Sequence, residues 1–63
     1  LLHVHRERDV ARLVASGLSS KEIAQRLDLS VRTVENYRAN LMQKIGVRDT
    51  VGLVRWCLEQ GLA

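Results

Sequence analysis

The sequence predicts an all-α fold with four helices. Aliphatic residues recur at helical spacing, and Ser, Asp and Gly residues mark where each run begins and ends. A chain of 63 residues has room for one domain. Its core is expected to be aliphatic, because the sequence has one Trp, one Tyr and no Phe. The chain begins at Leu1 and not at Met, so we expect a domain of a longer protein.

The first two helices are predicted from aliphatic spacing and capping residues. Residues 6–16 form the first and stop at Gly17, which suits a helix C-terminus. No Ser, Thr or Asp precedes this helix, so we expect a frayed start. Ser19 and Glu22 spell a capping box, which predicts a short helix over residues 20–27. The inward-facing aliphatic residues of the two helices are Val10, Leu13, Val14, Ile23, Ala24 and Leu27.

The third and fourth helices follow the same logic. Ser30 is a fresh N-cap, and residues 31–45 form the longest predicted helix, which ends at Gly46. About three residues separate it from the second helix, which is the spacing of a helix-turn-helix. Asp49 caps a fourth helix, predicted over residues 50–59.

Composition excludes several classes of protein. Ten Lys and Arg residues against seven Asp and Glu give a net charge of +3, which favours a polyanionic partner. Cys57 is the single cysteine, and no Cys and His cluster has zinc spacing, so we expect a cytoplasmic protein with no metal or other cofactor. His3 and His5 are interpreted as terminal linker rather than as a metal site. No apolar run is long enough to span a membrane.

Catalysis is not expected either. The sequence pairs no nucleophile with a base, places no two carboxylates in an apolar cleft and has no glycine loop to cradle a phosphate. We therefore predict that the chain is not an enzyme.

The helix predicted at residues 31–45 has two faces when successive side chains are placed about 100° apart. The apolar face, expected to be buried, comprises Val34, Tyr37, Leu41, Met42 and Ile45. The polar face comprises Arg32, Glu35, Asn36, Ala39 and Gln43. Asn36 suits adenine, Glu35 suits cytosine and the Ala39 methyl suits thymine. We therefore predict that this face reads double-stranded DNA in the major groove.

A second set of residues is expected to bind DNA phosphates. Ser30 and Thr33 lie at the N-terminus of the reading helix, where backbone amides and the helix dipole favour anions. Lysine and arginine side chains would add a salt-dependent attraction. The predicted phosphate-binding residues are Lys21, Ser30, Thr33, Tyr37, Asn40, Lys44 and Arg48.

Several of these side chains have a second interpretation. A polar helix face can simply be solvated. Glu35 either reads a base or orients Arg32 or Arg38, since phosphates repel an unpaired carboxylate. Arg38 lies beside the apolar face, and its head is expected to pair with an acid such as Glu22. Tyr37 is either a core-edge aromatic or a phosphate ligand.

The helix predicted at residues 50–59 is apolar over a broader arc than a monomer core requires. We therefore expect it to mediate a homodimer. The predicted interface residues are Val51, Val54, Trp56, Cys57 and Leu58. Alternatively, Trp56 covers the end of the first helix within one monomer.

Several linked motifs resemble the LuxR-type helix-turn-helix of NarL-like and FixJ-like response regulators. They are Arg6-Glu7, Gly17-Leu18-Ser19-Ser20-Lys21-Glu22-Ile23-Ala24, Leu29-Ser30-Val31-Arg32-Thr33-Val34-Glu35-Asn36-Tyr37-Arg38-Ala39-Asn40 and Lys44-Ile45-Gly46-Val47. Thr33-Val34-Glu35 followed by Arg38-Ala39-Asn40 is especially similar to the FixJ branch. One departure is His3-Val4-His5, where the family usually has Leu-Thr-Pro.

The resemblance implies a regulator of bacterial promoters. It implies that the third helix enters the major groove, that positions 35, 36 and 39 face the bases, and that the fourth helix mediates dimerisation on DNA. It also implies an N-terminal receiver domain or ligand-sensing domain in the full-length protein. The competing hypothesis is a protein-interaction module with the same fold, which Glu35 and the modest net charge favour.

Overall fold

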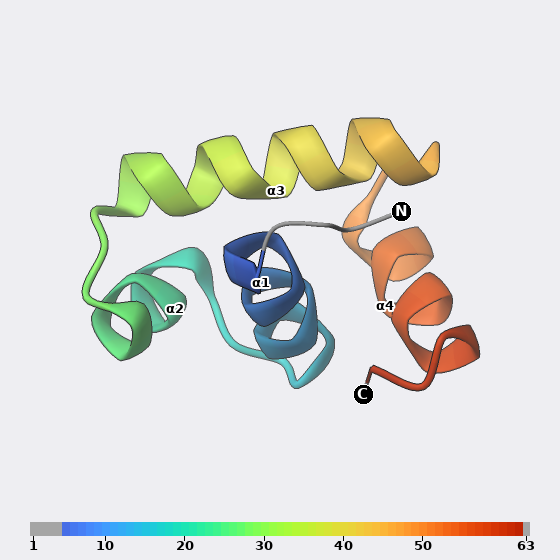
Figure 1. The fold of residues 1–63 in the computed structure, drawn as a ribbon, viewed down its shortest axis with the longest axis horizontal. Helices are drawn as coiled ribbons and strands as arrows, with labels where there is room; N and C mark the ends of the chain where they lie inside the picture. The colour runs from blue at the N-terminus through green and yellow to red at the C-terminus, as the bar shows by residue number, and fades with distance from the viewer. Residues whose placement is uncertain (1–4, 63) are drawn as a thin grey trace.

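The computed structural model describes residues 5–62 and folds them into four helices with no strand among them (Figure 1). The helices are α1 (His5–Ala15), α2 (Ser20–Leu27), α3 (Val31–Ile45) and α4 (Thr50–Glu59). The predicted all-α fold is confirmed, and each boundary lies within one residue of its predicted position. The predicted lack of a cap near Val4 and the side chains of His3 and His5 lie outside what the structure describes.

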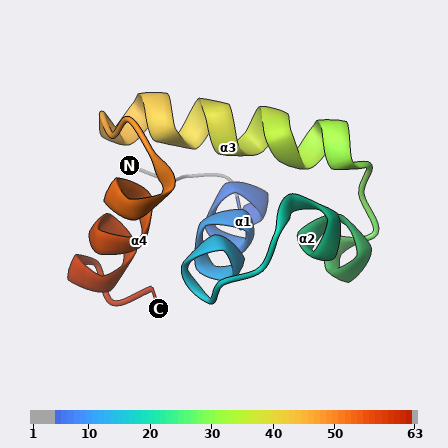
Figure 2. The same cartoon turned by 180° about the vertical axis from the view of Figure 1, so that it is seen from behind.

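α1 lies at the centre of the molecule. Figures 1 and 2 show it between α2 and α4, with α3 running across all three. α1 packs against each of the other helices, α3 also packs against α2, and α4 packs mainly against α1. Across residues 5–62, no helix combines the length and the apolar character that a membrane span requires.

The core is built from small and aliphatic side chains of all four helices. Its buried residues are Val10, Ala11, Val14, Ile23, Ala24, Val34, Leu41, Leu53 and Cys57. Leu13, Leu27 and Ile45, which the helical spacing also points inward, are partly buried against this cluster. Short side chains such as Ala11 and Ala24 let the helices approach closely.

Three helices begin at the predicted N-cap residues. The Ser19 amide donates to Glu22 Oε1 at 2.8 Å, and the Glu22 amide donates to Ser19 Oγ at 3.2 Å, which completes the capping box. The bond with the Ser19 backbone, and to a smaller extent the bond with the Ser19 side chain, stabilise the ionised carboxylate. They hold the pKa of Glu22 below its ordinary value. The side chains of Ser30 and Asp49 cap α3 and α4 by accepting the amide three residues further along.

The turn between α2 and α3 is closed by Asp28, which adopts a left-handed conformation with φ 57°. The amides of Asp28 and Leu29 both donate to the carbonyl oxygen of Ala24. Aspartate tolerates this region better than most residues, because its short polar side chain can bond locally. Gly46 ends α3, as predicted, and it adopts the same left-handed conformation with φ 77°. The short turn therefore fixes α3 relative to α2.

Candidate nucleic-acid interface

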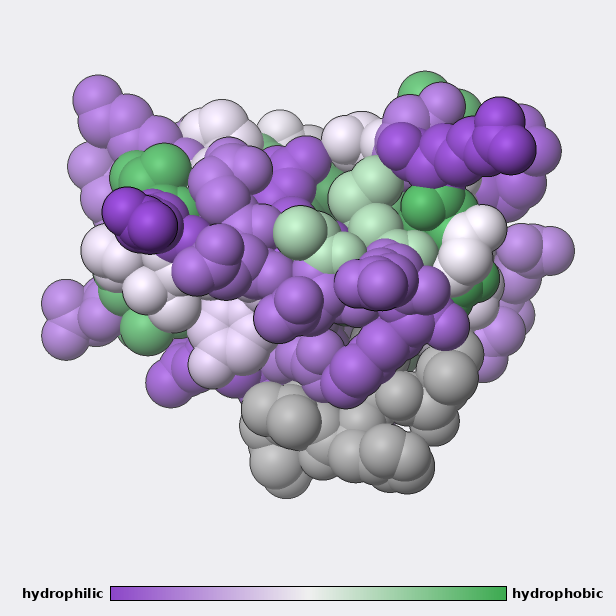
Figure 3. Space-filling model, turned by 90° about the horizontal axis from the view of Figure 1, so that it is seen from above, coloured by the Kyte–Doolittle hydropathy of each residue, from purple (hydrophilic) through white to green (hydrophobic). Residues whose placement is uncertain are grey.

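α3 presents the predicted reading face to solvent. The predicted reading residues are all exposed: Arg32, Glu35, Asn36, Ala39 and Gln43. On the opposite side Val34 and Leu41 are fully buried, so the core determines the direction of the exposed face. Figure 3 views the molecule from the side of α3, and hydrophilic side chains predominate there. With 15 residues the helix is about 22 Å long, which is enough to cross a groove about 12 Å wide.

The N-terminus of α3 has the polar groups on which the predicted phosphate contact rests. Ser30 Oγ accepts the Thr33 amide at 3.0 Å and lies 2.8 Å from Thr33 Oγ1. The first turn contains no acidic residue to oppose the positive end of the helix dipole. Ser30 is exposed and Thr33 is half-buried. Their hydroxyls therefore cap the helix at the surface of the domain.

Arg38 binds different partners from the one predicted. Its Nη1 donates to Ser20 Oγ and its Nη2 to Thr50 Oγ1, each at 3.1 Å. The predicted pairing with Glu22 is wrong, because the carboxylate of Glu22 accepts the Ser19 amide instead.

Glu35 is exposed. Among residues 5–62 the ion pairs are Arg6 with Asp9 and Lys44 with Glu7, so neither Arg32 nor Arg38 pairs with Glu35. Its carboxylate is therefore presented to solvent on the reading face.

Lys44 belongs to an ion pair that the sequence analysis missed. Its Nζ lies 2.8 Å from Oε1 of Glu7, a residue only 4% exposed. Glu7 lies one and two helical turns before Val10 and Val14 on the inward face of α1, and this spacing could have predicted its burial. Lys44 remains partly exposed, so its predicted phosphate contact stays a prediction beside this structural role.

The other predicted phosphate ligands differ in exposure. Lys21, Asn40 and Arg48 are exposed on α2, on α3 and in the loop before α4. Tyr37 is half-buried against the core, which fits its interpretation as a core-edge aromatic. A phosphate contact through its hydroxyl stays a prediction.

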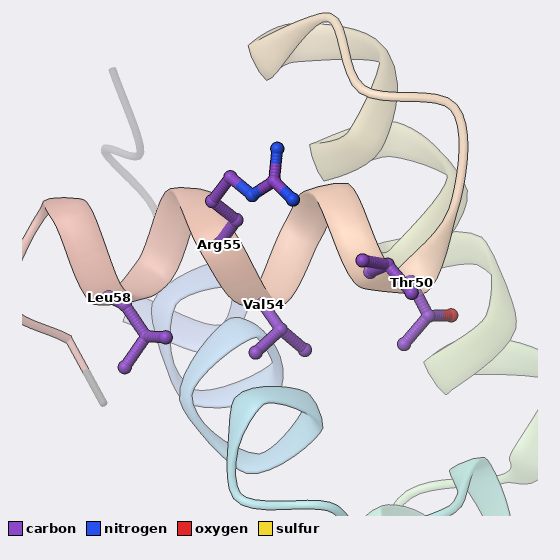
Figure 4. A pocket seen from close by; sticks show the side chains of 5 residues that line it. Thr50, Val54, Arg55 and Leu58 are labelled. Atoms are coloured by element: carbon purple, nitrogen blue, oxygen red, sulfur yellow. The ribbon is translucent and has the colours of Figure 1, made fainter.

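α4 divides its broad apolar arc between two sides. Val51 and Leu58 are 67% and 61% exposed, and they line a surface groove with Thr50, Val54 and Arg55 (Figure 4). The groove has a volume of about 370 Å³. The apolar side chains that line the groove form the outward part of the arc.

The inward side of α4 contains one of the residues predicted for the dimer interface. Cys57 is fully buried together with Leu53, and its Sγ lies 3.6 Å from the carbonyl oxygen of Ala11. Its assignment to a dimer surface is therefore wrong. Trp56 is half-buried and packs against the core, as in the alternative that keeps it within the monomer.

Two helices joined by a tight turn, with the second exposing a polar face, define the class of helix-turn-helix DNA-binding domains. Residues 4–57 match the family described as bacterial regulatory proteins, luxR family, and the chain belongs to that family. The predicted resemblance is thus confirmed. Membership identifies a DNA-binding domain of transcriptional regulators and not an enzyme.

Curated relatives carry a similar sequence within longer proteins. The transcriptional regulatory protein MctR of Rhizobium johnstonii is 44% identical over 57 residues, which are 90% of this chain and 27% of the relative. The transcriptional regulatory protein UhpA of Escherichia coli is 54% identical over 50 residues, 79% of this chain and 26% of the relative. The response regulator Rre1 of Synechocystis is 47% identical over 57 residues, 90% and 25% respectively. The chain spans about a quarter of the length of these relatives.

Proposed function

We propose that this chain is the output domain of a bacterial response regulator or ligand-gated regulator, and that it binds specific promoter sequences as a homodimer. The observation that carries the proposal is the exposed polar face of α3 on a luxR-family domain. The lengths and names of the relatives favour a receiver or ligand-sensing domain elsewhere in the full protein. A regulator of bacterial promoters acts in the cytoplasm.

The base-reading role is assigned to the middle of α3. Glu35, Asn36 and Ala39 lie on one exposed side, with Arg32 and Gln43 about one turn to either end. The Asn36 amide can make a bidentate pair with adenine, and the Ala39 methyl can contact thymine. A small residue at position 39 also permits close approach of the helix to the bases.

Sequence-independent affinity is assigned to the surrounding polar and basic residues. The amides at the start of α3 and the exposed side chains of Lys21, Asn40 and Arg48 are positioned for phosphates, provided that α3 lies in the groove. The net charge of +3 supports a salt-dependent attraction.

Selection of bound duplexes from a random library, followed by titration of Asn36→Ala, tests this proposal. We expect wild type to enrich a defined sequence and Asn36→Ala to lose about 1–3 kcal/mol of discrimination at one base pair. Asn40→Ala is the matched control on the same helix, and it should weaken all duplexes alike. A wild-type chain that enriches no sequence would contradict the reading role of α3.

A protein-interaction function is the second candidate. The exposed carboxylate of Glu35 favours it, because phosphates repel a carboxylate that has no partner. The Glu35→Gln chain separates the two candidates. If α3 reads DNA, this substitution changes base preference or raises affinity for all duplexes. An exposed face used only for proteins would leave DNA retention at background in both chains.

A further inference from the structure

The guanidinium of Arg38 joins three helices. Arg38 lies in the middle of α3, and its two terminal nitrogens donate to Ser20 Oγ and Thr50 Oγ1, both at 3.1 Å. Ser20 is the first residue of α2, and Thr50 is the first residue of α4. One planar side chain therefore contacts the beginnings of the two helices that flank α1.

The bond to Thr50 connects two parts of the domain that otherwise have little contact. α2 and α3 pack against each other, whereas α4 packs mainly against α1. Among residues 5–62, Arg38 supplies the side-chain hydrogen bond between the helix-turn-helix and α4. The loop of residues 46–49, which starts at the left-handed Gly46, also joins α3 directly to α4.

Arginine suits this task because its donors are held in one rigid plane. The two nitrogens can serve two acceptors with a fixed angle between them, whereas a lysine ammonium acts as a single point on a flexible stem. Arg38 is half-buried, which limits the freedom of its side chain. Both acceptors are hydroxyls, which fix the direction of the guanidinium without neutralising its charge.

We propose that Arg38 is a positioning residue that fixes the start of α4 relative to the helix-turn-helix, and thereby the half-site spacing that a dimer accepts. The spacing part rests on the proposed function, in which α4 joins two copies on DNA. The positioning part concerns the free chain and does not depend on DNA binding.

Amide hydrogen exchange of the free chain tests the positioning part. The amides of Gly52 and Leu53 donate to Asp49 in the first turn of α4 and report its opening. We expect Thr50→Val, which removes the acceptor, to speed their exchange about 2- to 10-fold, and Thr50→Ser, which keeps the hydroxyl, to leave it unchanged. Arg38→Met should speed it equally, and adding Thr50→Val to that chain should have no further effect. Equal exchange in Thr50→Val and Thr50→Ser would overturn the proposal.

Titration of duplexes with two half-sites at stepped separations tests the spacing part. We expect wild type and Thr50→Ser to prefer one separation, and Thr50→Val and Arg38→Met to accept neighbouring separations with a preference reduced about 2- to 10-fold. Affinity for a single half-site should be the same in Thr50→Val and wild type. A uniform loss in Arg38→Met with the spacing preference intact would instead make Arg38 a phosphate ligand. A wild type that binds no duplex contradicts the proposed function and the spacing part, while the exchange result still decides the positioning part.

Discussion

Glu7 places a carboxylate inside the core of this domain, and Lys44 compensates its charge from across the fold. Glu7 as a residue is 4% exposed, and Nζ of Lys44 lies 2.8 Å from its Oε1. Removing one member of such a pair leaves a buried charge without a partner, which costs more than the pair itself contributes. The main contribution of Lys44 is therefore expected to be to folding.

Substitution of Lys44 tests this role. We expect Lys44→Met to lower the free energy of unfolding by about 1–3 kcal/mol, because the Glu7 carboxylate loses its charged partner. Lys21→Met, at an exposed lysine on α2, should change it by less than about 0.5 kcal/mol. Urea unfolding monitored by circular dichroism measures both. Equal stability of the two variants would show that the ion pair contributes nothing to folding.

Cys57 offers a second test at the residue scale. Burial raises the pKa of its thiol, and its Sγ faces the carbonyl oxygen of Ala11. We expect iodoacetamide to modify Cys57 only as fast as the domain unfolds, and bound DNA to slow this labelling further because it stabilises the folded domain. A Gln60→Cys, Cys57→Ala chain carries an exposed thiol as the control and should react at once. Rapid labelling of Cys57 in the free chain, suppressed by DNA, would show that Cys57 lies at an interface after all.

Helical spacing predicted the side of the helix on which a residue lies but not its partner. Asn36 and Ala39 are exposed as expected, because the direction of a side chain follows from the period of its own helix. The partners of Arg38 are 18 and 12 residues away, and Glu7 and Lys44 are 37 residues apart. Such pairs depend on how helices cross, which a single sequence pattern does not contain.

At the scale of the element, the helix boundaries agree with the sequence because their signals are local. Ser19, Ser30 and Asp49 each bind an amide three residues further along, and no distant residue is needed to place them. α4 was harder to interpret. Its apolar arc was correctly located, but only packing against α1 shows that Leu53 and Cys57 face inward.

The capping box of α2 gives a pH-dependent prediction. The folded chain lowers the pKa of Glu22, so the ionised carboxylate stabilises the fold above its ordinary pKa of 4.5, and this contribution is lost as pH falls through the lower folded value. We expect Glu22→Gln to melt below wild type at pH 7 and the gap to close in acid. Glu35→Gln removes the same charge outside a cap, and its melting temperature relative to wild type should not follow this pattern. A gap for Glu22→Gln that persists unchanged at pH 3 would contradict the role of the charge.

At the scale of the whole molecule, α1 holds the other three helices together, and two exposed surfaces carry the proposed contacts. One is the polar face of α3, and the other is the groove of α4. The family pattern points to the same two helices, and the contacts they would make stay predictions. It did not predict that the groove would be limited to the outward side of α4, because that depends on which residues α1 covers.

The α4 groove predicts a defect in association without a defect in folding. We expect Leu58→Glu to abolish the binding of a second copy to duplexes with two half-sites, because a charge in the groove opposes apolar contact. Gln60→Glu, an exposed residue outside the groove, is the control and should assemble normally. Sedimentation on DNA counts the copies, and thermal unfolding of the free chains should be nearly equal. A Leu58→Glu chain that still assembles as a pair would place the dimer contact elsewhere.

The division of α4 into a buried and an exposed side affects how such regulators can evolve. Leu53 and Cys57 are constrained by packing in the core. Val51 and Leu58 are exposed, so the fold does not constrain them in this way. After a gene duplication, substitutions on the outward side would leave both daughter proteins folded. If copies join through this side, a few such substitutions are enough to stop the two daughters from forming mixed pairs, and each then keeps its own set of promoters.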